Sequence, residues 1–178
     1  METFLDLVKQ RRSIRTFTEE PLTEEQVVEL MKAALMSPSS KSTRGWDFVL
    51  VDNKDYLHQL SECKPVGAGL LEGASLAVVV VMDPEKSDVW IEDGSVASTI
   101  LLLQAEALGL GGCWVQIHNR CQEDQTPAED FVKQILGIPE NLKVLSIIGI
   151  GHKAMERKPQ NEDKLTWEKV HLNNFGNQ

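Results

Sequence analysis

The sequence predicts an α+β fold in which one mixed β-sheet is flanked by helices. Amphipathic helical patterns alternate irregularly with short runs of β-branched residues, which indicates a sheet covered by helices. No internal repeat, low-complexity tract or linker rich in proline or glycine and serine interrupts the chain. Its 178 residues suffice for one domain with a sizeable core, so we expect residues 1–178 to form a single domain.

Helical spacing of apolar residues predicts five helices. Thr23 and Thr126 are each followed three residues later by Gln or Glu, the spacing of a capping box. Gly109 and Gly137 follow two of the helices, where a residue without a Cβ atom ends a helix most easily. Ile100–Leu103 are all apolar, so we expect their helix to be buried on most sides. In chain order, the predicted helices cover residues 4–10, 23–36, 55–62, 89–108 and 127–136.

Runs of β-branched and aromatic residues predict four strands. Leu76–Met82 contains four consecutive valines, as expected of a strand that is buried on both faces. The predicted strands, in chain order, are residues 46–51, 76–82, 113–117 and 144–150. Residues 152–178 are polar with scattered apolar side chains, so we expect an extended tail that packs on another surface, such as a second subunit.

Composition and charge disfavour several classes of function. The formal net charge of −9 disfavours nucleic acid and anionic membranes as partners. The longest apolar run, Leu76–Met82, is far shorter than the roughly 20 residues of a membrane-spanning helix. No signal peptide is evident, and three cysteines without a disulfide spacing suit a reducing compartment, so we expect a cytoplasmic protein. Cys113, His118 and Cys121 lack a fourth ligand for zinc, so no metal is expected.

An arginine cluster is the first candidate site. Three of the six arginines lie within Arg11-Arg12-Ser13-Ile14-Arg15. Guanidinium groups bind phosphate through paired hydrogen bonds, and a serine hydroxyl adds a donor. Cations at a helix C-terminus also complement the helix dipole, which suffices to explain Arg11 or Arg12 alone. Arg15 lies beyond the helix end, where the dipole does not explain it, so the cluster favours an anionic ligand.

Two later segments carry further motifs. Residues 37–46 are dense in hydroxyl groups and contain two cations, a composition that by itself describes a surface loop. The pattern of residues 108–117 indicates a helix end followed by a buried strand. Their glycines follow a helix and precede a strand, the reverse of the order in a Rossmann pyrophosphate turn. A nucleotide would therefore bind by a different mechanism.

Together these segments resemble the FMN-dependent nitroreductase family. The motif R-R-S-x-R-x-F matches Arg11–Phe17, and L-G-L-G-x-C-W matches Leu108–Trp114. The motif S/A-P-S-x-x-N-x-Q-P-W is matched by Ser37, Pro38, Ser39 and Trp46, and the later L-G-I-P and G-x-G motifs by Leu136–Pro139 and Gly149–Gly151. The resemblance covers nearly the whole chain, and four motifs occur in register.

The resemblance implies a nitroreductase-like fold, a homodimer that holds FMN between its subunits, and a C-terminal tail exchanged over the partner. It implies that Arg11 and Ser13, with Arg12 beside them, hold the phosphate and ribityl chain, and that Arg15 faces the N1/O2 edge of the ring. The other implied cofactor residues are Pro38, Ser39, Ser40, Ser42 and Arg44 in the loop, the backbone of Gln116 and Ile117 near N5 and O4, Gly151, and Arg157 or Lys158 at the far end of the phosphate.

The chain departs from the family pattern in the loop and after the last strand. Ser42, Arg44 and Gly45 replace asparagine, glutamine and proline, and Lys153 replaces a proline. Ser42 is too short to make the contacts of an amide side chain, and Arg44 adds a positive charge near the ring. We therefore hypothesise that this chain has a raised flavin potential or prefers an anionic substrate.

The function implied is hydride transfer from NADH or NADPH through flavin N5 to an electron-poor small molecule, such as a nitroaromatic, quinone or enone, in a ping-pong cycle. The flavin carries this chemistry, so no catalytic side chain is expected. Two alternatives remain: a flavin-binding or sensory protein without turnover, and different flavin chemistry such as reductive dehalogenation. The Arg11–Arg15 segment favours an enzyme, as do Gly111 and Gly112, which are expected to leave space for a substrate.

Overall fold

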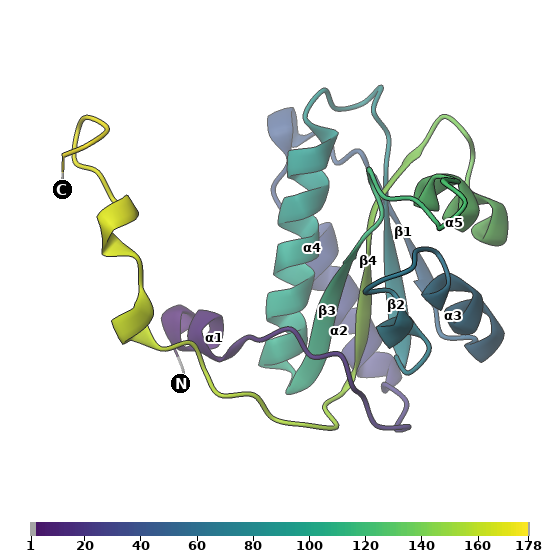
Figure 1. Ribbon diagram of the computed structural model, residues 1–178, viewed down its shortest axis with the longest axis horizontal. Helices are drawn as coiled ribbons and strands as arrows, with labels where there is room; N and C mark the ends of the chain where they lie inside the picture. Colours follow the sequence, from purple (N-terminus) through teal and green to yellow (C-terminus); the bar gives the residue numbers. More distant parts are fainter. Residues whose placement is uncertain (1–2, 178) are drawn as a thin grey trace.

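A four-stranded sheet lies between two layers of helices in the computed structural model, which describes residues 3–177 (Figure 1). The strands in chain order are β1 (Trp46–Val51), β2 (Leu76–Met82), β3 (Leu110–Gln116) and β4 (Lys143–His152). Their order across the sheet is β1-β2-β4-β3. The α+β class predicted from the sequence is confirmed.

The sheet is antiparallel, which corrects the expectation of a mixed sheet. Each of the three neighbouring pairs, β1–β2, β2–β4 and β4–β3, runs antiparallel. Because β2 and β3 both pair with β4, they run parallel to each other, and a long helix connects them. This helix forms a crossover, and β4 lies between the two strands that it joins.

Five α-helices cover the sheet and its margin: α1 (Phe4–Gln10), α2 (Glu24–Leu35), α3 (Lys54–Ser61), α4 (Trp90–Ala107) and α5 (Ala128–Leu136). Helices α2 and α4 pack on one face through Leu30 and Leu101. Helices α3 and α5 pack on the opposite face through Leu57 and Val132. Strand β2 is buried along its whole length, as its valines predict.

The predicted capping boxes have different outcomes. Thr23 accepts a hydrogen bond from the Gln26 backbone at the start of α2, as predicted. At α5 the cap residue is Pro127, and no side chain caps the helix. The carboxylate of Glu129 instead accepts from the Val144 N–H over 3.2 Å and pairs with a buried lysine, so it is not available for a capping box.

Strand β3 begins at Leu110, three residues earlier than predicted, because both glycines of the Gly111-Gly112 pair lie within the strand. Helix α4 is buried on one side only, and Ile91 and Val96 are exposed on its outer side. The expectation that this helix is buried on most sides is thus wrong for the single chain, which leaves an apolar surface uncovered.

The C-terminal segment and α1 project away from the sheet (Figure 1). The tail contains two short 3₁₀ turns, η3 (Glu162–Lys164) and η4 (Trp167–Lys169). It is attached to α1 by the Lys9–Glu162 ion pair of 2.6 Å. The extended tail predicted from the sequence is therefore present. None of the helices within residues 3–177 combines the length and apolar character needed to cross a membrane.

Candidate functional site

The arginine segment, residues 11–15, lies along the edge of β3. The Ile14 N–H donates to the Gly112 carbonyl oxygen over 3.1 Å, and Ser13 and Gly112 form a parallel bridge. A Cβ atom on Gly111 would lie 2.7 Å from Cγ2 of Ile14, which is only 2% exposed. Glycine is therefore required here so that the arginine segment can approach the strand closely.

The same geometry corrects one expectation about these glycines. The space beside Gly111 is filled by Ile14, and a Cβ atom on Gly112 would lie 2.8 Å from Leu102 of α4. Both glycines thus serve packing and do not leave space for a substrate.

Cations gather around the buried thiol of Cys113. Burial raises the pKa of Cys113, and this effect is opposed by Arg15, by hydrogen bonding to Ser13, and by the charges of Arg11 and Lys64. Within residues 3–177, no carboxylate forms an ion pair with Arg11 or Arg15. Cationic side chains without an internal counter-ion are suited to a phosphate, so these residues fit the phosphate of FMN.

Lys64 belongs to this group, and the sequence reasoning missed it. Its pKa is lowered, chiefly by burial, with a further contribution from the nearby charge of Arg120. Lys64 lies in the glycine-rich connection between α3 and β2, where no motif marks it. Its approach to Cys113 arises only because the chain folds back beside β3.

Arg12 and Arg157 lie in a different environment. Both line a cavity of 530 Å³ that also contains the paired side chains of Lys153 and Glu106. The Arg12 guanidinium donates to the backbone carbonyl of Lys158, and Nζ of Lys153 lies 2.7 Å from the Glu106 carboxylate. Arg12 thus contacts the start of the tail, whereas the charges of Arg11 and Arg15 act on Cys113.

Gly151 allows the chain to cross the end of the sheet. A Cβ atom there would lie 3.0 Å from Phe17, which forms an antiparallel bridge with Lys153. The Thr18 N–H donates to the His152 carbonyl over 2.9 Å and holds the crossing in place. Gly151 therefore contributes by accommodating Phe17.

The loop that contains Pro38, Ser39 and Ser40 has an unusual backbone. Three residues without the freedom of glycine have positive φ angles: Lys41 (51°), Ser42 (55°) and Arg44 (48°). Each such residue costs about 1–3 kcal/mol, and strain of this kind concentrates at functional sites. The Arg44 N–H donates to the Ser39 hydroxyl over 2.9 Å, so the loop closes on itself while the Arg44 side chain is exposed.

A buried carboxylate on α4 holds this loop. Oδ1 of Asp93 accepts from the Ser40 N–H over 2.8 Å, and Oδ2 accepts from the Ser87 hydroxyl over 2.7 Å. Asp93 is 5% exposed. The sequence reasoning missed Asp93, because an acidic residue in the first turn of a helix is common and needs no other explanation than the helix dipole.

The end of β3 presents backbone groups and one histidine. The Gln116 side chain bridges Trp114 and the His118 carbonyl. The N–H groups of Ile117 and His118 both donate to the Leu145 carbonyl oxygen, so the Ile117 N–H is not available to a ligand. The next residue, Asn119, has a φ of 56°, and within residues 3–177 no partner accepts from its N–H.

His118 has an unsatisfied polar atom beside this backbone. Its ring packs edge-on against Trp90, with the ring centroids 4.8 Å apart. Nδ1 is buried and has no hydrogen-bond partner in the described part of the chain. A buried polar atom without a partner is unfavourable, so it fits a site in which a ligand supplies that partner.

The loop and the arginine segment of one chain lie near opposite ends of the sheet. The loop precedes Trp46, which pairs with Met82 at the start of β1. Ser13 lies beside Gly112, which pairs with Ile150 and through it with Leu76, at the level where β1 ends. The two candidate elements therefore do not meet within one subunit.

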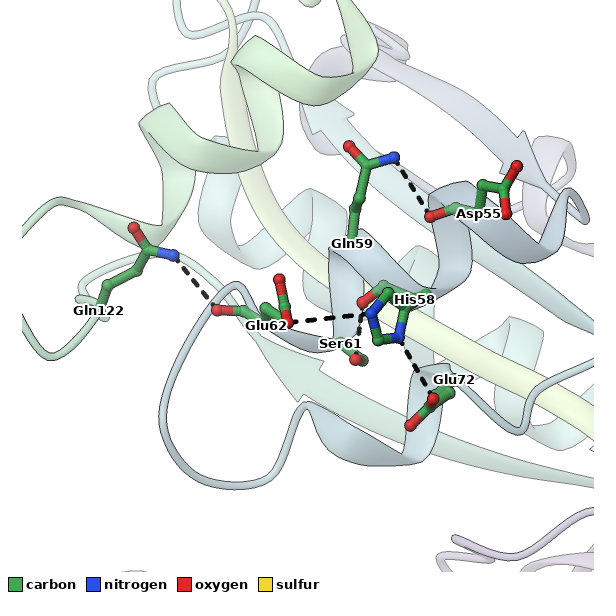
Figure 2. Close-up of polar contacts among 7 residues, drawn as sticks. All are labelled: Asp55, His58, Gln59, Ser61, Glu62, Glu72 and Gln122. Atoms are coloured by element: carbon green, nitrogen blue, oxygen red, sulfur yellow. Dashed lines mark hydrogen bonds and ion pairs between the residues drawn. The ribbon is translucent and has the colours of Figure 1, made fainter.

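A separate polar cluster lies on α3 (Figure 2). His58 contacts Glu72 over 3.2 Å and Glu62 over 3.9 Å, and the Gln122 side chain donates to the Glu62 carbonyl. These charged side chains are exposed, so they contribute little stability and connect α3 to two neighbouring loops. Between residues 3 and 177 no group of three or more His, Cys, Asp or Glu side chains could hold a metal ion.

Comparison with known proteins places these features in a family. A model of the nitroreductase family matches residues 8–152. A protein of Archaeoglobus fulgidus, named as an NADH dehydrogenase/NAD(P)H nitroreductase, is 32% identical over 96% of this chain and 98% of its own. The NADPH-flavin oxidoreductase of Vibrio harveyi is 27% identical over 93% of this chain and 71% of its own. The structure of an FMN-dependent nitroreductase from Clostridium difficile R20291 has a TM-score of 0.94 and 42% identity, covering 97% of this chain and all of that one (100%).

Proposed function

This chain belongs to the nitroreductase family, and on that premise we propose that it is an FMN-dependent oxidoreductase that uses NADH or NADPH. The observation that carries the proposal is the bridge between Ser13 and Gly112, which holds Arg11, Ser13 and Arg15 at the edge of β3 with no ion-pair partner for either arginine among residues 3–177. When bound, FMN supplies hydride transfer at N5 from NAD(P)H to an electron-poor acceptor, such as a nitroaromatic, quinone or enone, in a ping-pong cycle.

The residues of this chain would hold the cofactor and adjust its charge environment. Arg11 and Ser13 would bind the phosphate and ribityl chain. Arg15 would lie at the N1/O2 edge, where its fixed positive charge stabilises the negative charge of the reduced ring and raises its potential. Lys64 adds a cation to this group. Arg157 or Lys158 would close the far end of the phosphate site.

The end of β3 would bind the polar edge of the ring through its backbone. The backbone around Gln116 and Ile117 would approach N5 and O4, and the N–H of Asn119, for which residues 3–177 provide no acceptor, would be a further donor there. Pro38, Ser39 and Ser40 of a second subunit would line the ring. No side chain is assigned as a catalytic acid or base, because the transferred hydride requires none.

Exposed apolar side chains in the tail and α1 support a homodimer. Trp167 is 70% exposed, Phe175 in the tail 94%, and Phe4 of α1 70%. Large apolar side chains that lie exposed along one segment are typical of an interaction surface. A second copy whose tail crosses α1 and the outer side of α4 would bury them, and would bring its loop to the cofactor site of the first. A cytoplasmic location remains a prediction.

The proposal is tested by the absorption spectrum of the purified protein, followed by anaerobic addition of NADH or NADPH. Flavin bands that bleach with either donor, and return when a nitroaromatic or quinone is added, are the expected result. Flavin bands that neither donor bleaches would favour a flavin-binding protein without turnover. A protein that stays colourless after incubation with FMN would refute the proposal.

A further inference from the structure

We propose that Asp93 is a positioning residue that holds the loop of residues 37–45 in the shape required by the cofactor site of the partner subunit. The inference rests on the proposed function, because it assumes that this loop lines an FMN ring. Asp93 itself would touch neither cofactor nor substrate and would act through the loop backbone.

The hydrogen bonds of Asp93 support this role. Both carboxylate oxygens are used, one by the Ser40 N–H over 2.8 Å and the other by the Ser87 hydroxyl over 2.7 Å. Asp93 is buried on α4, a helix of 18 residues packed against the sheet. A charge-assisted hydrogen bond from a rigid helix therefore fixes the backbone at Ser40.

The loop needs an external anchor because its own conformation is unfavourable. Lys41, Ser42 and Arg44 all have positive φ angles, which L-residues with a Cβ atom adopt rarely. Within the loop, the Ser42 N–H donates to the Ser39 carbonyl and the Arg44 N–H donates to the Ser39 hydroxyl. Both hydrogen bonds lie in turns that are accessible to solvent. The Asp93 bond to Ser40 ties this strained segment to the rest of the fold.

Asp93 should act across the subunit boundary. The loop lies near one end of the sheet, whereas Ser13 lies beside Gly112 near the other end. The loop of one chain therefore cannot line a ring whose phosphate is held by Ser13 and Arg11 of the same chain. Asp93 of one subunit would shape the site whose phosphate the other subunit binds.

Removal of the carboxylate should weaken FMN binding without preventing dimer formation. Asp93→Ala removes both hydrogen bonds, and we expect FMN affinity to fall about 10- to 100-fold, with an altered visible circular dichroism of the bound flavin. Asp93→Asn keeps an oxygen that accepts from the Ser40 N–H, and the Ser87 hydroxyl can rotate to accept from the new amide group. Its loss of FMN affinity should therefore be several-fold smaller. Ser87→Ala leaves the Ser40 bond intact and serves as the matched control, with near wild-type affinity.

A mixed dimer tests the direction of the effect. Asp93→Ala subunits with one affinity tag are combined with Arg11→Gln/Arg15→Gln subunits with another, and dimers that carry both tags are titrated with FMN. If Asp93 acts on the partner's site, one site combines an intact arginine segment with an intact loop, and each mixed dimer binds one FMN with wild-type affinity. If it acts on its own subunit, both sites are defective.

Two results would overturn the inference: mixed dimers without a site of wild-type affinity, or Asp93→Ala dimers with wild-type affinity and an unchanged flavin spectrum. If Asp93→Ala does not fold, Asp93→Asn takes its place in the same mixed dimer. A wild-type protein that binds no FMN would refute the proposed function, and the positioning role with it.

Discussion

The backbone N–H of Ile14 donates to the carbonyl oxygen of Gly112 over 3.1 Å, and this bond joins the arginine segment to the edge of β3. It fixes the positions of Arg11, Ser13 and Arg15 relative to Cys113. The proposed site is thus built on a strand edge, so Gly111, which accommodates Ile14, should matter for cofactor binding as well as for packing.

Gly111→Ala should separate the arginine segment from β3. The added Cβ atom would lie 2.7–2.8 Å from two atoms of Ile14, so one of the two backbones must move. We expect a loss of about 1–3 kcal/mol in unfolding free energy and a loss of FMN affinity of at least tenfold. Urea denaturation and fluorescence titration with FMN measure the two effects.

Gly112→Ala is the matched control for this prediction. Its Cβ atom would lie 2.8 Å from Leu102 of α4, and none of its three nearest neighbours belongs to the arginine segment. The loss of stability should be similar, while FMN affinity changes less. Equal losses of affinity in the two variants would contradict the role assigned to Gly111.

Arg44→Gln should lower the midpoint potential of the bound flavin. The exposed guanidinium adds a positive charge on the loop proposed to line the ring, and removing a cation disfavours the reduced, more negative cofactor. A decrease of about 15–30 mV corresponds to roughly 0.7–1.4 kcal/mol for a two-electron couple. A redox titration in which the potential is unchanged would remove the electrostatic role.

The alternative role of Arg44 is recognition of an anionic acceptor. It predicts that Arg44→Gln raises the KM for 4-nitrobenzoate and leaves the KM for 4-nitrobenzyl alcohol unchanged.

Trp167→Ala should weaken the homodimer. The indole is exposed in the single chain and lies in the tail that is proposed to cross the partner. A tryptophan that acts as an interface hot spot contributes at least about 2 kcal/mol, so the dimer dissociation constant should rise at least about 20-fold. Tyr56→Ala removes an exposed aromatic side chain from α3, on the other side of the sheet, and should leave association unchanged. Sedimentation velocity that shows no difference between the two variants would argue against the exchanged tail.

Cys63 should make the protein less stable at alkaline pH. Burial raises the pKa of its thiol from 9.0 to about 11 in the folded state. Its contribution is fully present below pH 9 and is lost as the pH rises toward 11, because only the unfolded chain then releases the proton. The loss is about 2–3 kcal/mol, and Cys63→Ala should show a correspondingly shallower decline of unfolding free energy over this range. Parallel curves for the two proteins would contradict the prediction.

Much of the fold could be predicted because local patterns and tertiary packing agree. The valines of β2 and the capping box at Thr23 predicted their elements correctly. The start of β3 was missed because glycine is unfavourable in strands, and only the approach of Ile14 explains Gly111 there. The mixed sheet was wrong because sequence does not reveal that β4 inserts between β2 and β3.

The candidate site was predicted in part. Motifs identified the arginine segment and the serine loop, because these residues are close together in the sequence. Lys64 and Asp93 were missed, since the proposed role of each depends on a distant segment: Lys64 acts through its charge on Cys113, and Asp93 accepts a hydrogen bond from Ser40. The separation of Arg12 from Arg11 and Arg15 likewise depends on the course of the tail, which no local motif specifies.

The most direct test of the central claim is a titration of the cofactor-free protein with FMN, comparing wild type with Arg11→Gln/Arg15→Gln. We predict one FMN per wild-type chain, and at least a 100-fold weaker affinity in the double variant, since two charge-assisted contacts contribute about 1.5–3 kcal/mol each. Riboflavin lacks the phosphate bound by Arg11 but keeps the ring edge faced by Arg15, so it should lose only the Arg15 contact, and its affinity should differ less between the two proteins. Equal FMN affinities for wild type and the double variant would show that the arginine segment on β3 does not build the cofactor site.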